Sequence, residues 1–497
     1  MHQLVTNIER KRVAAARTGQ EFLGRLKNSP PNLWYGGERV TDPTTHRAFK
    51  NISLSISHLY DIQRQRPDLM LYESPLSGRL VSKSFMVPKT TADLLEIGHA
   101  MKETANFSWG MMGRAPDYMN RTLTAYAGAH QFLEEGVPGA GNAMLNYYQM
   151  MRENDLCLTH TLITPQANRS LGPSAQAEPF LAARVKCESD KGIVVKGARM
   201  LATLPLADEI MVFPSTLLKS TEADAPYAFG ASIPTNTPGL KLLCRETLDY
   251  GGDAYDHPLG SRFDEMDAVV IFDDVLIPWE RVFLYRDVDR CNQAYMRTGA
   301  LVNMAHQSVI RAIAKTEYLL GLVSLMVDTM GVENFQHIQE KKAEVWVNLE
   351  VMRSCLRASE ADAGLDEWGV MRPAWNPLDA ARNLFPRLYP RMIEIVQLIG
   401  ASGLVSMPTQ ADVSGPLQQD ISVYFQAARA EAFDRIPIFK LAWDTALSAF
   451  GSRQVLYERF YFGDPVRMAG AINVNHSREI KEYAAKVKEG ILHCAPA

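Results

Sequence analysis

The chain has 497 residues, 46% of them hydrophobic and 22% charged, with a formal net charge of −4. These fractions are ordinary for a globular protein, and the length exceeds one typical hydrophobic core, so we expect two or three subdomains. The weakly acidic balance argues against a nucleic-acid-binding protein, which would carry a basic stripe. No apolar run reaches the roughly 20 residues of a membrane span, and the first residues lack a signal-peptide pattern. We therefore expect a cytoplasmic protein without a membrane or nucleic-acid partner.

Cysteine spacing and the common cofactor motifs exclude several further classes. The six cysteines are spread along the chain without a CxxC or CxxxC pair, which is typical of reduced cytosolic thiols. The chain lacks the HExxH, Walker A and GxGxxG motifs, and the glycine-rich run 136–141 lacks the lysine and preceding strand of a phosphate loop. The sequence therefore predicts no metal site.

Three zones with different hydrophobic periods follow one another along the chain. Residues 1–150 show helical spacing, most clearly over 92–109 and 117–132. In 151–288 the period changes to two, which predicts strands at 182–188, 193–203, 209–213, 228–233, 240–244 and 268–272. In 289–497 long amphipathic helices are predicted at 292–330, 336–363, 378–400 and 435–462. We thus predict an α+β fold with a helical N-terminal domain, a middle β-barrel or sandwich, and a C-terminal four-helix bundle with a tail.

The first candidate site lies where the second N-terminal helix begins. Arg114 precedes this helix, Pro116 occupies its first position, and Tyr118 lies in its first turn. The four-residue spacing brings the guanidinium and the phenol near one another, and the helix N-terminus favours an anion there. Such a group suits a phenolate or a carboxylate. A surface arginine paired with Asp117, beside a tyrosine packed in the core, is the competing interpretation.

The second candidate is an imidazole on a predicted strand at 156–162. The side chain of His160 shares one strand face with three leucines, because strand side chains repeat every two residues. A histidine on an apolar face is costly unless a partner uses it, and a backbone carbonyl is the ordinary partner. The polar turn that follows, up to Arg169, offers further hydrogen-bond donors.

Two further segments carry polar groups near predicted element ends. Arg199 and Thr203 share one face of the strand at 193–203, where a threonine is also an unremarkable strand residue. The helix at 435–462 ends at Gly463, and Pro465 follows, which is a sound C-terminal stop. In this turn Asp464 is either a solvent-facing cap or part of a site.

The order of a helical domain, a β-domain and a bundle resembles the acyl-CoA dehydrogenase fold, in which a flavin lies between the β-domain and the bundle. Four motifs make the resemblance more specific: MMGRAPDY at 111–118, LTHTLITPQANR at 158–169, KGARMLAT at 196–203 and FGDPVRMA at 462–469. In this order, and over nearly the whole chain, they resemble the two-component 4-hydroxyphenylacetate 3-monooxygenase family. That family includes chlorophenol monooxygenases and a pyoverdine-cluster monooxygenase.

The resemblance implies roles for the matching positions of this chain. Arg114, Tyr118 and His160 would surround the phenol hydroxyl of the substrate as catalytic residues, and Ser215 and Thr216 would hold its polar tail. Thr203 would hydrogen-bond the isoalloxazine. The other flavin contacts implied are His160, Thr161, Leu162, Gln166, Ala167, Asn168, Arg169, Phe462, Gly463, Asp464 and Pro465. The loop after Thr216 is a candidate lid over the site.

The resemblance also implies the reaction. Family members take reduced FAD (FADH2) from a separate reductase, O2 adds to it to give a C4a-hydroperoxide, and the phenol is hydroxylated in the ortho position. A free phenol has a pKa near ~10, so the site must favour the phenolate, which the permanent charge of Arg114 does. His160 would be the base or hydrogen-bond partner, since the ordinary pKa of histidine is near neutrality. The resemblance further implies a homotetramer formed through the bundle.

Three other classes of protein are compatible with parts of this pattern. A 4-hydroxybutyryl-CoA dehydratase would need an iron–sulfur cluster, for which only His306 resembles a ligand. An acyl-CoA dehydrogenase would need a catalytic carboxylate in the bundle, where Glu350 and Glu360 are available but resemble solvated helix positions. A non-enzymatic helical scaffold would not need polar groups in three zones of the chain.

Overall fold

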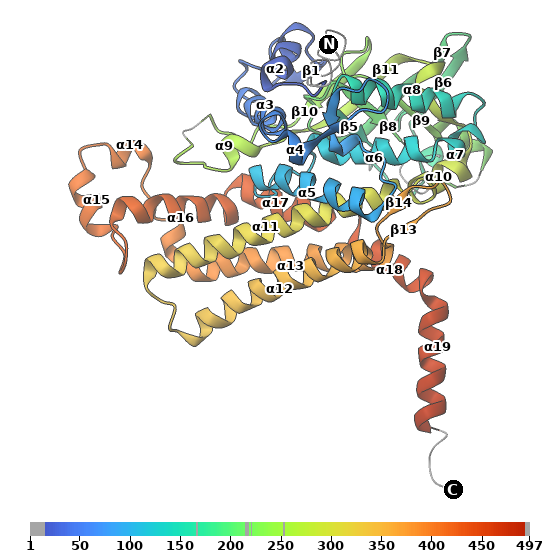
Figure 1. Ribbon diagram of the computed structural model, residues 1–497. Coiled ribbons are helices and arrows are strands. Elements are labelled where there is room, and N and C mark those ends of the chain that lie inside the picture. The colour runs from blue at the N-terminus through green and yellow to red at the C-terminus, as the bar shows by residue number, and fades with distance from the viewer. Residues whose placement is uncertain (1–14, 166, 214–217, 220, 252–253, 493–497) are drawn as a thin grey trace, which may run out of the picture.

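The computed structural model describes residues 15–165, 167–213, 218–219, 221–251 and 254–492. Helices make up most of its first part, drawn in blue and cyan in Figure 1. Capping boxes begin two of them, because Thr18 and Thr90 each accept a hydrogen bond from the backbone three residues on. The helices are α2 (Gly19–Asn28), α3 (Lys50–Gln65), α4 (Pro67–Met70), α5 (Thr91–Phe107), α6 (Pro116–Gly128), α7 (His130–Glu134) and α8 (Ala140–Glu153). The helix predicted at 117–132 is therefore two helices.

Two sheets form the middle of the molecule. The six-stranded sheet has the order β2-β1-β10-β11-β7-β6, and the four-stranded sheet has the order β12-β9-β8-β5. Their strands are β1 (Leu33–Tyr35), β2 (Glu38–Arg39), β5 (Leu158–Thr161), β6 (Arg184–Ser189), β7 (Gly192–Thr203), β8 (Glu209–Val212), β9 (Phe229–Pro234), β10 (Leu240–Cys244), β11 (Asp267–Pro278) and β12 (Val282–Tyr285). The N-terminal segment extends the larger sheet, because β1 pairs in parallel with β10. A short separate pair, β3 (Leu71–Glu73) and β4 (Leu80–Ser82), belongs to the helical part.

The strand that carries His160 is buried on both faces. β5 pairs in parallel with β8 and also contacts β7 and α6. All four of its residues are buried, so neither face is turned to solvent. The alternation of apolar residues therefore identifies one buried face of the strand, and the second face is buried as well. The hydroxyls of Thr159 and Thr161 on that second face donate hydrogen bonds to backbone carbonyls.

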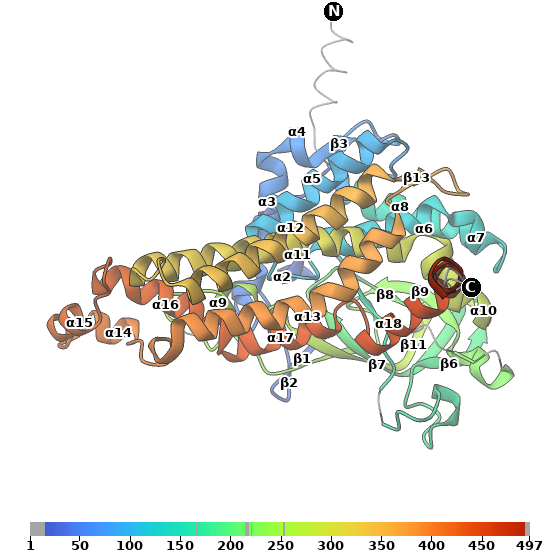
Figure 2. The same ribbon diagram turned by 90° about the horizontal axis from the view of Figure 1, so that it is seen from below.

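Five helices form the C-terminal bundle, with α10 (Val288–Arg297) leading into it. They are α11 (Ala300–Met330), α12 (Gln336–Ala361), α13 (Trp375–Gly400), α16 (Ala432–Ala446) and α17 (Ala449–Phe460). Two predicted helices are each split in two: Gly299 has a φ of 75° between α10 and α11, and Ser448 caps α17 after α16 has ended. α11 lies at the centre, because it contacts α5 and α6 as well as α12 and α13. Figure 2 shows these helices running beside the sheets.

The bundle carries two extensions. α14 (Gln410–Val413) and α15 (Gln418–Tyr424) lie at one end, and the hairpin of β13 (Gly364–Leu365) and β14 (Met371–Arg372) follows α12. At the other end α18 (Pro465–Asn475) leads to α19 (Ser477–Val487), which projects away from the body and has no buried residue (Figure 1). Within the described ranges, none of the helices combines the length and apolarity that crossing a bilayer requires.

The fold brings α6, β5 and α17 together although they are far apart in the sequence. Tyr118 of α6, Leu158 of β5 and Tyr461 beyond α17 belong to one hydrophobic cluster. α8 continues to Glu153 and α10 begins at Val288, near the domain boundaries predicted at 150/151 and 288/289, which stay predictions.

Candidate active site

The backbone just before α6 is fixed by the bundle. Gly110 has a φ of +72°, and a Cβ there would lie 2.6 Å from the carbonyl oxygen of Arg311. At Gly113 a Cβ would collide with the ring and hydroxyl of Tyr457. The carbonyl of Gly113 also accepts a hydrogen bond of 2.7 Å from Tyr461. Both glycines are therefore required by close approach, and they hold Arg114 against α17.

Arg114 is enclosed by aromatic rings. Its Cζ lies 4.4 Å from the ring centre of Tyr118, 4.2 Å from that of Tyr461 and 5.9 Å from that of Tyr457. Burial disfavours the guanidinium charge, but the surrounding phenolic oxygens and Glu265 outweigh it and raise the pKa of Arg114 well above its usual value. Arg114 is therefore a permanent cation held in a fixed orientation, each desolvated cation–π contact being worth about 2 kcal/mol.

The imidazole of His160 completes this cluster. Its ring centre lies 5.7 Å from that of Tyr118, so the structure brings the three predicted catalytic residues together. Burial, and then the charge of Arg114, lowers the pKa of His160 well below 6.5. The expectation of a pKa near neutrality is thus not met, since both effects oppose a second positive charge. At neutral pH this histidine is an uncharged imidazole that offers one donor and one acceptor.

Several polar atoms of the cluster have no partner within the chain. Arg114 Nη1, His160 Nδ1 and the Tyr457 hydroxyl are all buried and make no hydrogen bond to the described residues. A buried polar atom without a partner costs about 1–3 kcal/mol, so three of them in one place point to an absent ligand. Burial raises the pKa of Tyr118 above its usual value despite Arg114, which keeps its hydroxyl protonated and able to donate. The donor set therefore fits an oxygen anion such as a phenolate.

A buried ion network supports the cluster from the bundle side. Glu458 accepts two hydrogen bonds from Arg311, at 2.6 and 2.8 Å, and one of 2.6 Å from Lys315. The Cζ of Arg311 in turn lies 4.4 Å from the ring centre of Tyr461, whose ring also contacts Arg114. The orientation of Arg114 thus depends on charges that are entirely buried between α11 and α17.

The residues implied to bind the flavin lie around this cluster in two groups. Thr161 is buried and donates to the carbonyl of Met200, and Thr203 donates to Asp267 at 2.9 Å, which leaves its lone pairs available. In the turn after α17 the Phe462 ring lies 5.4 Å from Tyr461, Gly463 has a φ of +126°, and Asp464 caps α18. Leu162 and Pro465 are half-buried, and Ala167, Asn168 and Arg169 are exposed.

Three predicted site residues fall outside the described part of the chain, namely Gln166, Ser215 and Thr216. The loop after Thr216, which is the candidate lid, makes ordered contacts in its described residues. Leu218 exchanges two hydrogen bonds with the Asn292 side chain, and a 3₁₀ turn spans Glu222–Tyr227.

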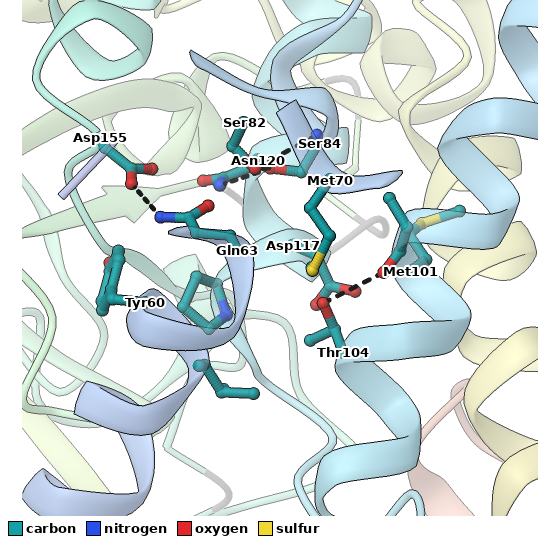
Figure 3. A pocket seen from close by; sticks show the side chains of 13 residues that line it. Tyr60, Gln63, Met70, Ser82, Ser84, Met101, Thr104, Asp117, Asn120 and Asp155 are labelled. Atoms are coloured by element: carbon teal, nitrogen blue, oxygen red, sulfur yellow. Dashed lines mark hydrogen bonds between the residues drawn. The ribbon is translucent and has the colours of Figure 1, made fainter. Parts of the chain in front are cut away.

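A small, partly open cavity with both apolar and polar lining lies within the N-terminal helical part, and Asp117 forms part of its wall. The volume of about 30 Å³ has room for about two water molecules, and its lining includes Tyr60, Gln63, Asp117, Asn120 and Asp155. Figure 3 shows the Asp117 carboxyl beside Met70 and Thr104. Asp117 accepts a hydrogen bond of 3.2 Å from Gln307 rather than pairing with Arg114, which excludes the surface ion pair considered from the sequence.

Asp117→Asn is expected to gain stability relative to the wild type as the pH rises. Burial raises the pKa of Asp117 from 3.8 to about 7, so the folded state retains a proton that the unfolded state loses between these values. This linkage makes the wild type less stable as the pH rises through that window, and between about pH 5 and about pH 8 the effect is about 3 kcal/mol. Urea unfolding of both proteins at the two pH values measures it. An equal difference at both would contradict a protonated Asp117.

Comparisons with known proteins agree with this geometry. The family described as "4-hydroxyphenylacetate 3-hydroxylase N terminal" matches residues 18–284, and "4-hydroxyphenylacetate 3-hydroxylase C terminal" matches 291–489. The chain is 48% identical over 480 residues to a 4-hydroxyphenylacetate 3-monooxygenase oxygenase component of Thermus thermophilus. The aligned region covers 96% of this chain and 98% of that protein. It is 31% identical over 460 residues, 90% of this chain and 86% of the relative, to a 4-nitrophenol 2-monooxygenase oxygenase component of Rhodococcus.

Solved structures show the same fold. The structure of an HpaB oxygenase component complexed with FAD and 4-hydroxyphenylacetate matches with a TM-score of 0.92 and 46% identity, over 97% of this chain and 100% of that one. A 4-hydroxybutyryl-CoA dehydratase from N. maritimus matches with a TM-score of 0.85 at 20% identity, covering 96% and 95%, which shows a shared fold only.

The fold and the buried cationic cluster define a flavin-dependent aromatic monooxygenase, as the sequence predicts. The chain belongs to the 4-hydroxyphenylacetate 3-hydroxylase family.

The competing classes find no support in the geometry of the described residues. His306 bonds to Glu360 at 2.8 Å, Glu350 forms an exposed pair with Arg353, and no metal-binding group of His, Cys, Asp and Glu is present in that part of the chain. Neither carboxylate is therefore placed in the cluster around Arg114.

Proposed function

We propose that the chain hydroxylates 4-hydroxyphenylacetate, or a phenol closely similar to it, in the ortho position, with reduced FAD supplied by a separate reductase. In the balanced reaction the phenol, O2 and FADH2 give a catechol, FAD and water. The observation that carries the proposal is the cluster of Arg114, Tyr118 and His160, in which Arg114 Nη1 and His160 Nδ1 are buried and lack a hydrogen-bond partner within the described chain.

Each of these three side chains has a distinct part in ionising the phenol. Arg114 supplies the positive charge, and a cation within hydrogen-bond distance lowers the pKa of a neighbouring acid by about 1–3 units. Tyr118 donates a hydrogen bond to the phenol oxygen, because its own pKa is raised by burial. His160, uncharged at neutral pH, offers a ring N–H to the phenol oxygen, and the phenol proton passes to solvent as the substrate binds. The ionised oxygen then makes the ortho carbon electron-rich.

The flavin-binding role rests on the two groups of residues beside the cluster. When bound, reduced FAD activates O2 so that one oxygen atom can be transferred to the ring. Thr203 and Thr161 on the β side, with Phe462, Gly463, Asp464 and Pro465 on the bundle side, would hold the isoalloxazine between them, with His160, Leu162, Gln166, Ala167, Asn168 and Arg169 completing the contacts. Ser215 and Thr216 would hold the carboxylate tail, and the loop after them would exclude water.

The test supplies chemically reduced FAD and O2 to the protein with a panel of phenols. We expect 3,4-dihydroxyphenylacetate from 4-hydroxyphenylacetate, and no product from phenylacetate, which has no hydroxyl group to ionise. Oxidation of the reduced FAD to give hydrogen peroxide alone with every phenol would contradict the proposal.

We further propose a homotetramer in the cytoplasm. The support is exposed apolar surface on the bundle, where Trp346, Val347 and Val351 of α12 are between 37% and 54% exposed, and on the projecting helix α19. Leu325 of α11 and Leu398 of α13 are also about half exposed, so these helices add to the apolar contact surface of α12 and α19.

Sedimentation velocity is expected to give a single species of four chains, because covering this apolar surface is favourable. Trp346→Glu should shift it to smaller assemblies, whereas Glu350→Gln beside it should not. A monomer at micromolar wild-type concentration would contradict the assembly.

A further inference from the structure

Glu265 is a buried carboxylate that the proposed chemistry does not use. It lies between α9 (Gly260–Phe263) and β11, is fully buried, and accepts a hydrogen bond of 2.6 Å from the backbone N–H of Arg114. Its neighbour Met266 has a φ of +61°, in the left-handed region that a side chain of this size rarely adopts. The segment is thus held in a costly conformation that brings the β-domain against the start of α6.

The two carboxylates that flank Glu265 are fully paired, and Glu265 is not. Asp264 binds Arg245 at 2.6 Å, and Asp267 binds Arg453 at 2.6 Å and Arg245 at 2.8 Å. The nearest cation to Glu265 Oε2 is Arg453, at 3.8 Å, and Oε2 makes no hydrogen bond to the described residues. Its negative charge is therefore only partly neutralised.

The groups that act on Glu265 come from three parts of the fold. They are Arg114 before α6, Arg453 and Tyr457 on α17, and Lys315 on α11. Burial raises the pKa of Glu265, while Arg453 and the N–H groups of Gly113 and Arg114 oppose that shift. The charge of Glu265 thus acts on the same cluster of side chains as the charge of Arg114.

We propose that Glu265 is a positioning residue for the hydroxylation, which anchors the main chain of Arg114 and weakens, by its negative charge, the field that Arg114 exerts on the phenol. The inference rests on the proposed function, and it adds a negative charge that opposes the positive charge of Arg114 at the same site. One oxygen supplies the anchor and the carboxylate as a whole supplies the charge, so two conservative variants separate the two effects. Glu265→Gln keeps an oxygen acceptor for the Arg114 N–H and removes the charge. Glu265→Asp keeps the charge and shortens the reach.

The experiment follows the ionisation of bound 4-nitrophenol by its phenolate absorbance, in anaerobic protein that holds reduced FAD. Glu265→Gln is expected to lower the pKa of the bound phenol by about one unit, because a negative charge beside it is removed. Glu265→Asp is expected to leave that pKa near the wild-type value and to raise KM, since Arg114 loses its anchor. Glu344→Gln, which changes a partly exposed carboxylate paired with Arg391 on the bundle, is the matched control and should change neither.

The outcomes separate this inference from the proposed function. If Arg114→Ala raises the pKa of bound 4-nitrophenol but Glu265→Gln leaves it unchanged, Glu265 has no electrostatic part and the inference is overturned. If Arg114→Ala itself leaves the pKa unchanged, the proposed site is wrong and the inference falls with it.

Discussion

Arg114→Ala is expected to lower the yield of hydroxylated phenol by about 100-fold, while reduced FAD is still oxidised by O2. The reason is electrostatic: losing a cation next to an ionising phenol raises its pKa by about two units, and each unit is a factor of ten in the phenolate fraction. The guanidinium is held by Tyr118 and Tyr461, and the charge of the neighbouring Arg311 is already paired with Glu458. Catechol and hydrogen peroxide are measured together after mixing the variant with reduced FAD, substrate and O2.

Two further variants provide a comparison for the Arg114→Ala result. His160→Ala should also favour peroxide, with a smaller loss, because an uncharged imidazole contributes a hydrogen bond rather than a charge. Arg391→Ala removes an arginine from an exposed pair on the bundle and should leave the ratio of catechol to peroxide as in the wild type. An unchanged ratio in Arg114→Ala would remove Arg114 from the mechanism.

Glu458→Gln is expected to lower the free energy of unfolding by about 3–5 kcal/mol, because it leaves two buried cations without their partner. Arg311, Lys315 and Glu458 are all fully buried, and the two cations hold the pKa of Glu458 down to about 2. Burial has already lowered the pKa of Lys315 to about 8, so the variant should lose its proton there more easily than the wild type. Urea unfolding at neutral pH measures the loss.

The exposed carboxylate of Glu350 provides the control for this variant. Glu350→Gln breaks a surface pair with Arg353 and should cost less than about 1 kcal/mol. A loss of similar size in both variants would contradict the view that the buried network supports the site.

Local patterns predicted the parts of this site that depend on short stretches of chain. Arg114 and Tyr118 are four residues apart across a helix start, and the strand at β5 follows from alternation around His160, so both features were visible in the sequence. The helix after 116 was predicted too long because apolar spacing continues across Gly128–His130, where the backbone changes direction between α6 and α7. Periodicity reports which face is apolar, and it does not report such bends.

The residues that sequence reasoning missed act over long separations. Tyr457 and Tyr461 cover Arg114 from more than 340 positions away, and Glu265 holds its N–H from 151 positions away. The two tyrosines are four residues apart at the end of α17, with Tyr461 as its C-cap, and this spacing was a usable signal for a shared face, but nothing in the sequence states what that face contacts. Glu265 follows a short helix without a motif, and only the fold places it beside Arg114.

The most direct measurement is a crystal structure of this protein with reduced FAD and 4-hydroxyphenylacetate bound under anaerobic conditions. We expect the phenol oxygen within hydrogen-bond distance of Arg114, Tyr118 and His160, with the ring beside the isoalloxazine. A substrate bound with its hydroxyl away from Arg114, or in a separate cavity, would contradict a site that ionises the phenol.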